Sequence, residues 1–250
     1  MTGMIPWRLW CLAGSLLAGG ALLSATPVFG YSYGPASDAE WAGWPEFCKV
    51  RFTVSGEGSG SQFGGTYPPE VVAQWQDKFG ECWGLLHHHC GALLLLQRAK
   101  GAVRPQDRRF ALESAVAENN FALNACPAEN PFHSVIVTHL GLTFTEAGAQ
   151  AKATQQFDRA ISLHPTYAGA YVAKASLLKR QGSPSTALDV LIKGSDATNG
   201  ESPELENALG LAYFDAKQFE KAREHARRAY SLGFPLPALR DKLVRAGFPL

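Results

Sequence analysis

Small side chains recur at a fixed spacing in the C-terminal half of the chain, and this internal repeat limits the fold more than any other feature. Three successive segments, residues 134–167, 168–201 and 203–236, align with one another at offsets of 34 and then 35 residues. Two aligned positions hold only glycine or alanine: Gly141, Ala175 and Gly210 at the first, and Ala153, Ala187 and Ala222 at the second. A period of this length is typical of stacked helical hairpins.

The size of these side chains explains why the repeat predicts paired helices. A methyl group or less lets the two helices of a hairpin approach closely, whereas a large side chain would push them apart. Further residues at fixed distances would complete the same core: Phe144, Leu178 and Tyr213 after the first small position, and Phe157, Leu191 and Ala226 after the second. Residues 237–250 then predict a short amphipathic helix, through Leu239 and Leu243, that caps the open end of the stack.

The pattern closely resembles the tetratricopeptide repeat family. The third segment matches it best, through Leu209, Gly210, Tyr213, Ala222, Ala229 and Pro235. The first matches nearly as well, through Leu140, Gly141, Phe144, Ala153, Phe157, Ala160 and Pro165. The middle segment departs from the pattern, with Gly194 where alanine is usual and no closing proline. The resemblance implies an all-α solenoid of helical hairpins over residues 134–236 that binds a protein partner.

The N-terminal half predicts a helical region rich in cysteine, tryptophan and histidine. Residues 31–69 hold an aromatic segment and a Gly/Ser-rich loop, and residues 70–133 form a helical hairpin that resembles a degenerate repeat. We expect one long helix from Glu70 to about Lys100 and a second that begins at Pro105. About a dozen extra residues, 97–108, lengthen this hairpin, either as a contact site or as a tolerated insertion. The aromatic residues Trp41, Trp44, Phe47 and Phe52 either pack on the helix that follows or bind a partner or a sugar.

The first 30 residues have the features of a signal peptide. Arg8 gives a positive start, residues 9–25 are apolar, and small residues near Gly30 suit cleavage. The alternative is an uncleaved helix that anchors the chain in a membrane. We therefore expect a periplasmic or secreted protein, or else one anchored at its N-terminus. After cleavage we expect no stable insertion into a membrane.

Export makes the four remaining cysteines, Cys48, Cys82, Cys90 and Cys126, candidates for two disulfides. If Cys82 and Cys90 lie on one helix, eight residues separate them by roughly 12 Å, which is too far for a disulfide. Two connectivities then remain. We favour Cys90–Cys126 together with Cys48–Cys82.

The cluster from His87 to Cys90 supports an alternative function in metal or cofactor handling. His87, His89 and Cys90 are potential ligands, and His133, His139 or Cys126 could add others from the next hairpin. The competing interpretation places His87 and Cys90 in the repeat core, where a disulfide-bonded cysteine suffices. The sequence contains no Gly-x-Ser-x-Gly and no phosphate-binding loop. We expect neither an enzyme nor a cofactor.

The resemblance also implies which residues line the concave groove of the stack. Carried over to this sequence, the partner-binding positions are His88, Thr138, Glu146, Lys179, Arg180, Asn207, Phe214 and Asp215. Their mixture of apolar and singly charged groups suits an extended or helical peptide. Asn207 is the strongest candidate, because its amide can both donate to and accept from a peptide backbone.

Charge argues against nucleic acid as a partner. The net charge is +1, and no long run of like charges appears. The basic residues of the last hairpin, such as Arg223 and Arg227, alternate with Glu220 and Glu224, which predicts ion pairs on a solvated face. We therefore expect a periplasmic adaptor or scaffold that recruits a protein during assembly of an envelope structure, such as pilus, secretion or polysaccharide machinery. The sequence specifies neither the partner nor the oligomeric state.

Overall fold

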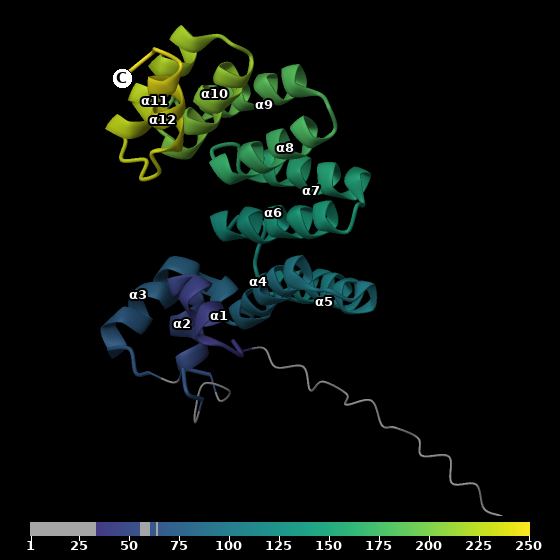
Figure 1. The fold of residues 1–250 in the computed structure, drawn as a ribbon. Helices are drawn as coiled ribbons and strands as arrows, with labels where there is room; N and C mark the ends of the chain where they lie inside the picture. Colours follow the sequence, from purple (N-terminus) through teal and green to yellow (C-terminus); the bar gives the residue numbers. More distant parts are fainter. Residues whose placement is uncertain (1–33, 56–60, 64) are drawn as a thin grey trace, which may run out of the picture. The chain divides into compact units, whose positions relative to one another are not determined.

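The computed structural model describes residues 34–55, 61–63 and 65–250, and these ranges fold entirely into helices and their connections (Figure 1). The predicted all-α class, with helical hairpins packed in chain order as in tetratricopeptide repeats and an N-terminal region rich in cysteine and tryptophan, is confirmed. The predicted signal peptide, residues 1–30, lies outside the described residues. Within the described ranges, no helix combines the length and apolar character needed to cross a bilayer.

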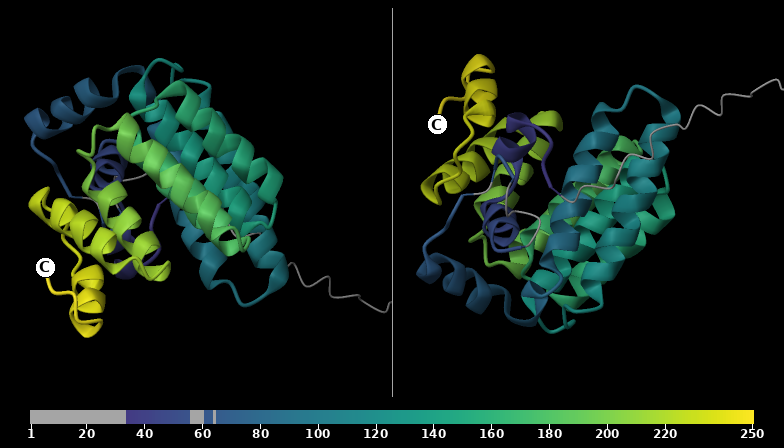
Figure 2. Two further views of the ribbon diagram at one scale, coloured as in Figure 1. Left: turned by 90° about the horizontal axis from the view of Figure 1, so that it is seen from above. Right: turned by 90° about the horizontal axis from the view of Figure 1, so that it is seen from below.

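Three hairpins form the C-terminal part of the stack, and Figures 1 and 2 show them following one another in order. Their helices are α6 (Pro131–Glu146) with α7 (Gln150–Leu163), α8 (Ala168–Arg180) with α9 (Pro184–Ala197), and α10 (Pro203–Asp215) with α11 (Phe219–Ser231). Each helix packs against the next along the chain. The first helices of successive hairpins also touch, α6 with α8 and α8 with α10, and this continuous row is characteristic of a solenoid.

The same C-terminal cap ends the first helix of each hairpin. Residues Gly148, Gly182 and Lys217 have φ of 75°, 76° and 60°. In each hairpin the next backbone N–H donates to the carbonyl five residues earlier, at 2.9 to 3.0 Å: Ala149 to Phe144, Ser183 to Leu178 and Gln218 to Tyr213. This bond is one of the pair that defines a Schellman cap, which turns the chain sharply into the second helix.

The small residues of the repeat lie where helices meet. Ala153, Ala187 and Ala222 are all buried. A Cβ added to Gly141 would lie 2.5 Å from the Phe157 ring, so only glycine fits at this crossing. Close packing also explains why Gly194 stands where the repeat pattern usually has alanine, because a Cβ there would lie 2.7 Å from Tyr171 and 2.9 Å from Leu205. Gly194 is therefore fitted to its neighbours in the second hairpin.

The expected long helix over residues 70–100 is wrong, because the chain breaks it into three parts. These are α3 (Pro69–Phe79), the 3-10 helix η1 (Gly80–Trp83) and α4 (Leu86–Gly101), and α4 then pairs with α5 (Pro105–Leu123). The break occurs at Gly80, whose φ of 52° cannot continue a right-handed helix.

Two short helices, α1 (Asp38–Gly43) and α2 (Glu46–Thr53), pack the aromatic N-terminal segment onto this region. The indole N–H of Trp44 donates to the Cys90 carbonyl at 3.1 Å, which ties α1 to α4. Phe47 contacts the rings of Trp75 and Phe79. Packing therefore accounts for these aromatic side chains. At the other end α12 (Ala238–Arg245) covers α10 and α11 with Leu239 and Leu243, both fully buried.

Candidate functional site

The two disulfides fix the N-terminal hairpin, but their pairing differs from the one we favoured. Cys48 is bonded to Cys90, and Cys82 to Cys126. The expected pairs Cys90–Cys126 and Cys48–Cys82 are wrong because of the register of the α4–α5 hairpin. Cys82 precedes α4 and Cys126 follows α5, so antiparallel packing of these two helices brings both cysteines to the same end of the hairpin. Cys90 lies further along α4, where it meets Cys48 on α2.

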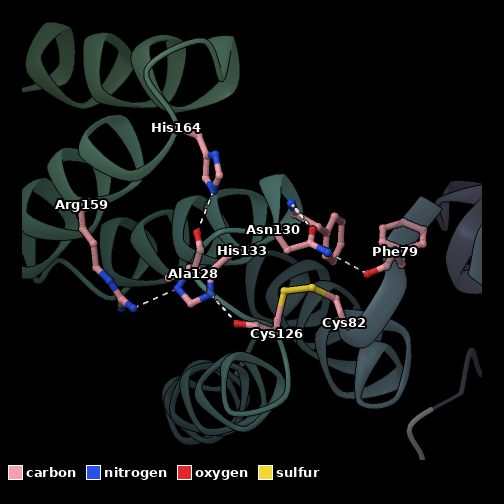
Figure 3. Close-up of a disulfide and its surroundings, with 9 residues drawn as sticks. Phe79, Cys82, Cys126, Ala128, Asn130, His133, Arg159 and His164 are labelled. Carbon is pink, nitrogen blue, oxygen red and sulfur yellow. Dashed lines mark hydrogen bonds between the residues drawn. A yellow bond between two sulfur atoms is a disulfide. The ribbon is translucent and has the colours of Figure 1, made fainter. Parts of the chain in front are cut away.

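The Cys82–Cys126 bridge lies beside the connection between α5 and α6, which further polar contacts hold in place (Figure 3). His133 donates from Nδ1 to the Cys126 carbonyl at 2.7 Å and accepts at Nε2 from Arg159 at 3.0 Å. His164 donates to the Ala128 carbonyl at 2.9 Å. These histidines therefore serve the connection between the N-terminal region and the repeats.

The cluster from His87 to Cys90 is divided among separate contacts. The sulfur of Cys90 is in a disulfide, so the metal hypothesis loses its thiolate ligand. His87 accepts from Arg51 at 3.2 Å, and His88 pairs with Glu118 at 2.6 Å. Burial, with the neighbouring charges of His88 and Arg51, lowers the pKa of His87 to about 4. Within the described ranges, no group of three or more histidine, cysteine or acidic residues is placed to hold a metal ion.

His89 is the fully buried member of this cluster. Its Nδ1 donates to Asn119 at 2.8 Å, and its ring centroid lies 5.0 Å from that of His139 on α6. Its Nε2 has no hydrogen-bond partner among the described residues. Burial lowers the pKa of His89 to about 3 and that of His139 to about 4, so both rings are neutral where the α4–α5 hairpin meets the repeats.

A cavity of about 670 Å³ opens between the second and third hairpins, and its lining comes mainly from α8, α9 and α10. Apolar side chains from three helices form most of its lining, including Val172 of α8, Leu188 and Leu191 of α9, and Leu211 of α10. Polar groups lie among them, notably Asn207 on α10 and the ion pair between Lys179 and Asp215. We refer to this cavity as the α8–α10 groove.

Three of the eight predicted groove residues, Lys179, Asn207 and Asp215, line the α8–α10 groove. Asn207 is half-buried, and its amide makes no hydrogen bond to another described residue. It can therefore bond to a ligand backbone without breaking a contact of the fold. Lys179 and Asp215 are more exposed, and their ion pair connects the C-terminal ends of α8 and α10.

The other five predicted residues make contacts elsewhere. Glu146 pairs with Arg108 at 3.4 Å and with Arg180 at 3.8 Å, which connects three hairpins at their turns. Thr138 is buried at 3% exposure, so it does not line a surface groove. His88 faces α5 through Glu118. Phe214 is half-buried with its ring 5.3 Å from that of Phe219.

The groove also contains residues that the repeat pattern did not identify. Leu188 and Leu191 come from the second helix of a hairpin, and Phe234 comes from the loop after α11. The family pattern assigns the groove to first helices alone, so it gave no reason to select them. Their apolar character was visible in the sequence, but their direction depends on how the hairpins pack.

A buried carboxylate holds α10 in place beside the groove. Glu206, which is 0% exposed, accepts from Ser195 of α9 at 2.5 Å and from His225 of α11 at 2.8 Å. Arg228 lies 3.5 Å from the same carboxylate. A buried carboxylate that is bonded to several partners restrains the helix that carries it. The neighbouring Asn207 is thereby held on the groove wall.

Comparisons with known proteins add a structural likeness. No protein-family model matches the chain, and no curated protein sequence matches it. MamA from Desulfovibrio magneticus RS-1 is 22% identical, over 62% of this chain and 85% of that one, with a TM-score of 0.40. Another MamA crystal structure is 19% identical, over 62% and 80%, with a TM-score of 0.42. A MamA AMB-1 structure is 16% identical, over 65% and 80%, with a TM-score of 0.41. The tetratricopeptide type of the fold follows from the hairpins, caps and small-residue contacts of this chain itself.

Proposed function

We propose that this protein is an exported adaptor that holds a short segment of a partner protein in the α8–α10 groove. The observation that supports this best is a largely apolar cavity whose wall presents Asn207 with a free amide. Clefts that bind ligands combine apolar walls with a few placed polar groups. The other polar groups of the lining are hydroxyls, the Gln218 amide, the Glu204 carboxylate and the Lys179–Asp215 ion pair.

The length of the groove limits what it can hold. Its lining follows α10 from Glu204 to Ala216, and a helix of this length measures roughly 20 Å. An extended peptide rises about 3.3 Å per residue, so about six residues fit along the groove. We expect apolar side chains in the middle of this peptide. Its backbone would bond to Asn207, and its ends would lie near Glu204 and near the Lys179–Asp215 pair.

The two disulfides support an oxidising compartment, because such bonds persist in exported proteins and are rare in the cytosol. This agrees with the proposed signal peptide and with a periplasmic or secreted location. An adaptor in that compartment could serve the assembly of pilus, secretion or polysaccharide machinery. The groove suits each of these equally.

The first experiment identifies the partner segment. A photoreactive residue at Leu211, inside the groove, should capture a protein in the native envelope. The same residue at Asp189, exposed on α9 and outside the lining, is the control position. Capture at Leu211 should disappear when Ser176, an exposed groove residue, is replaced by Trp to fill the cavity.

The captured segment is then made as a peptide and its Kd is measured by calorimetry. Asn207→Ala should raise the Kd about 5- to 30-fold, because one or two hydrogen bonds of about 1 kcal/mol each are lost. The melting temperature should stay nearly unchanged, since the amide makes no contact within the fold. Asn120→Ala, on the exposed face of α5, is the matched control and should leave the Kd unchanged. A Kd that is insensitive to both Asn207→Ala and Ser176→Trp would refute the proposal.

A further inference from the structure

A second surface at the C-terminal end shares no residue with the α8–α10 groove. A shallow hollow of about 460 Å³ is lined by Arg227, Tyr230, Arg240, Val244, Pro249 and Leu250. Leu236 adjoins it, because the Tyr230 hydroxyl donates to the Leu236 carbonyl at 3.0 Å and accepts from the Arg240 backbone N–H at 3.1 Å. We call these seven residues the C-terminal patch.

The aliphatic residues of the patch are exposed, whereas other aliphatic residues of α12 are buried in the core. Leu239 and Leu243 lie in the core at 0% exposure, whereas Leu236 is 60% exposed and Val244 is 54% exposed. Leu250 is 36% exposed. Apolar side chains held outward in one place, and flanked by polar groups, are typical of surfaces that meet a partner or a membrane.

The patch also carries positive charge that the fold does not neutralise. Residues 219–250 contain seven lysines and arginines against three acidic residues, although the whole chain has a net charge of +1. Three of these seven cations have acidic partners: Arg223 pairs with Glu220, Arg228 with Glu206 and Glu224, and Lys242 with Asp215.

Arg227 and Arg240 differ from these paired cations. Neither has a carboxylate within ion-pair distance among the described residues. The Arg240 guanidinium lies 4.4 Å above the Tyr230 ring, which leaves its edge free to bond an anion. The expected ion pairs of the last hairpin therefore do not include Arg227.

We propose that the C-terminal patch docks the protein on an anionic lipid surface. Unpaired arginines beside outward aliphatic side chains fit the boundary between charged headgroups and acyl chains. The aliphatic groups of the patch are each more than one third exposed, so they suit shallow insertion better than they suit an enclosed peptide pocket. The contact is weak and reversible, and it weakens as salt screens the charges. It would hold the α8–α10 groove close to an envelope membrane.

Vesicle flotation of the intact exported protein tests this directly. We expect binding to vesicles that contain phosphatidylglycerol, little binding to pure phosphatidylcholine vesicles, and loss of binding at high ionic strength. Each arginine near an anionic surface contributes about fivefold, so the double variant R227A/R240A should lower the partition coefficient about 25-fold. The double variant L236S/V244S should lower it several-fold by removing the apolar contact.

The matched control is K221A/R223A, which removes two positive charges from α11 outside the patch. It should change the partition coefficient by less than about threefold, because Arg223 is already paired and Lys221 lies over Tyr213. Equal loss in this control would mean that net charge alone drives binding, and it would overturn the proposal. Equal binding to both kinds of vesicle would also overturn the proposal.

The proposal would also be overturned if the protein bound no vesicles but did bind a polyglutamate peptide at the patch. If the L236S/V244S variant bound this peptide equally well, the partner would be an acidic protein. Melting temperatures of all variants confirm folding, and peptide binding in the groove should be unchanged.

Discussion

At the scale of single residues, the positions that lack a side chain are those that the fold determines most strictly. Gly141 lies against Phe157, and Gly210 lies against Leu239 of α12, each with only 2.5 Å between its added Cβ and the neighbouring side chain. Both glycines are buried at helix crossings. Interiors are packed too densely to admit even a methyl group without movement of the neighbours.

Gly141→Ala should therefore destabilise the protein by about 1–3 kcal/mol, since Phe157 is fully buried and has no room to move aside. Urea unfolding followed by circular dichroism measures the change. Gly101→Ala is the matched control, because nothing lies within 4 Å of its added Cβ at the end of α4. That variant should be neutral or stabilised by up to about 1 kcal/mol through helix propensity. Equal effects in the two variants would contradict the packing explanation.

At the scale of helices, the contact between α4 and α6 depends on two neutral histidines. Burial holds the pKa of His89 at about 3 and that of His139 at about 4, against roughly 6.5 in an unfolded chain. The groups near them are Asn119 on α5, Lys100 on α4 and each other. No carboxylate faces either ring among these contacts, so a proton on one of them would lack a partner.

The sign of the pH effect follows from these lowered pKa values. Below pH 6.5 the unfolded chain binds protons that the folded chain excludes, so the free energy of unfolding falls as the pH drops toward 4. The slope is about 1.4 kcal/mol per pH unit for each histidine, and neither contributes a slope above about pH 7. Urea unfolding between pH 7 and pH 4 measures it. In the His139→Gln variant the slope should decrease by about 1.4 kcal/mol per pH unit, the contribution of one histidine. An unchanged slope would show that His89 and His139 do not cause the pH dependence of stability.

At the scale of the whole molecule, the two disulfides hold the N-terminal helices to the hairpin that begins the stack. The bonded cysteines are 42 and 44 residues apart in sequence. A bond that closes a loop of this size stabilises the fold chiefly by restricting the unfolded chain. Stability of the N-terminal region therefore depends on the compartment in which the chain folds.

The double variant Cys48→Ser/Cys90→Ser should lose about 2–4 kcal/mol of stability, visible as a lower melting temperature. Adding a reductant to the unchanged protein should lower the melting temperature at least as much, because it opens both bonds. Mass spectrometry of an unreduced digest should find Cys48 linked to Cys90 and Cys82 linked to Cys126. A linked peptide joining Cys90 to Cys126 would contradict the register of the α4–α5 hairpin.

The C-terminal hairpins could be predicted from the spacing of residues alone. The spacing of Gly141, Ala175 and Gly210 is a local property of each segment. Side chains this small would leave gaps unless the two helices of a hairpin packed closely. The assignment of Asn207, Lys179 and Asp215 to a groove came from the resemblance to the tetratricopeptide repeat family, which places these repeat positions on the inner face of the stack.

Features that depend on how separate helices pack against one another could not be predicted in this way. The disulfide pairing required the register of α4 against α5, together with the break at Gly80 that no periodic pattern revealed. The burial of Thr138 depended on helices that pack from other parts of the chain. The α9 wall of the groove and the outward position of Val244 arise in the same way. A repeat specifies contacts within its own period, whereas contacts between distant elements depend on their relative rotation, which the spacing of residues does not encode.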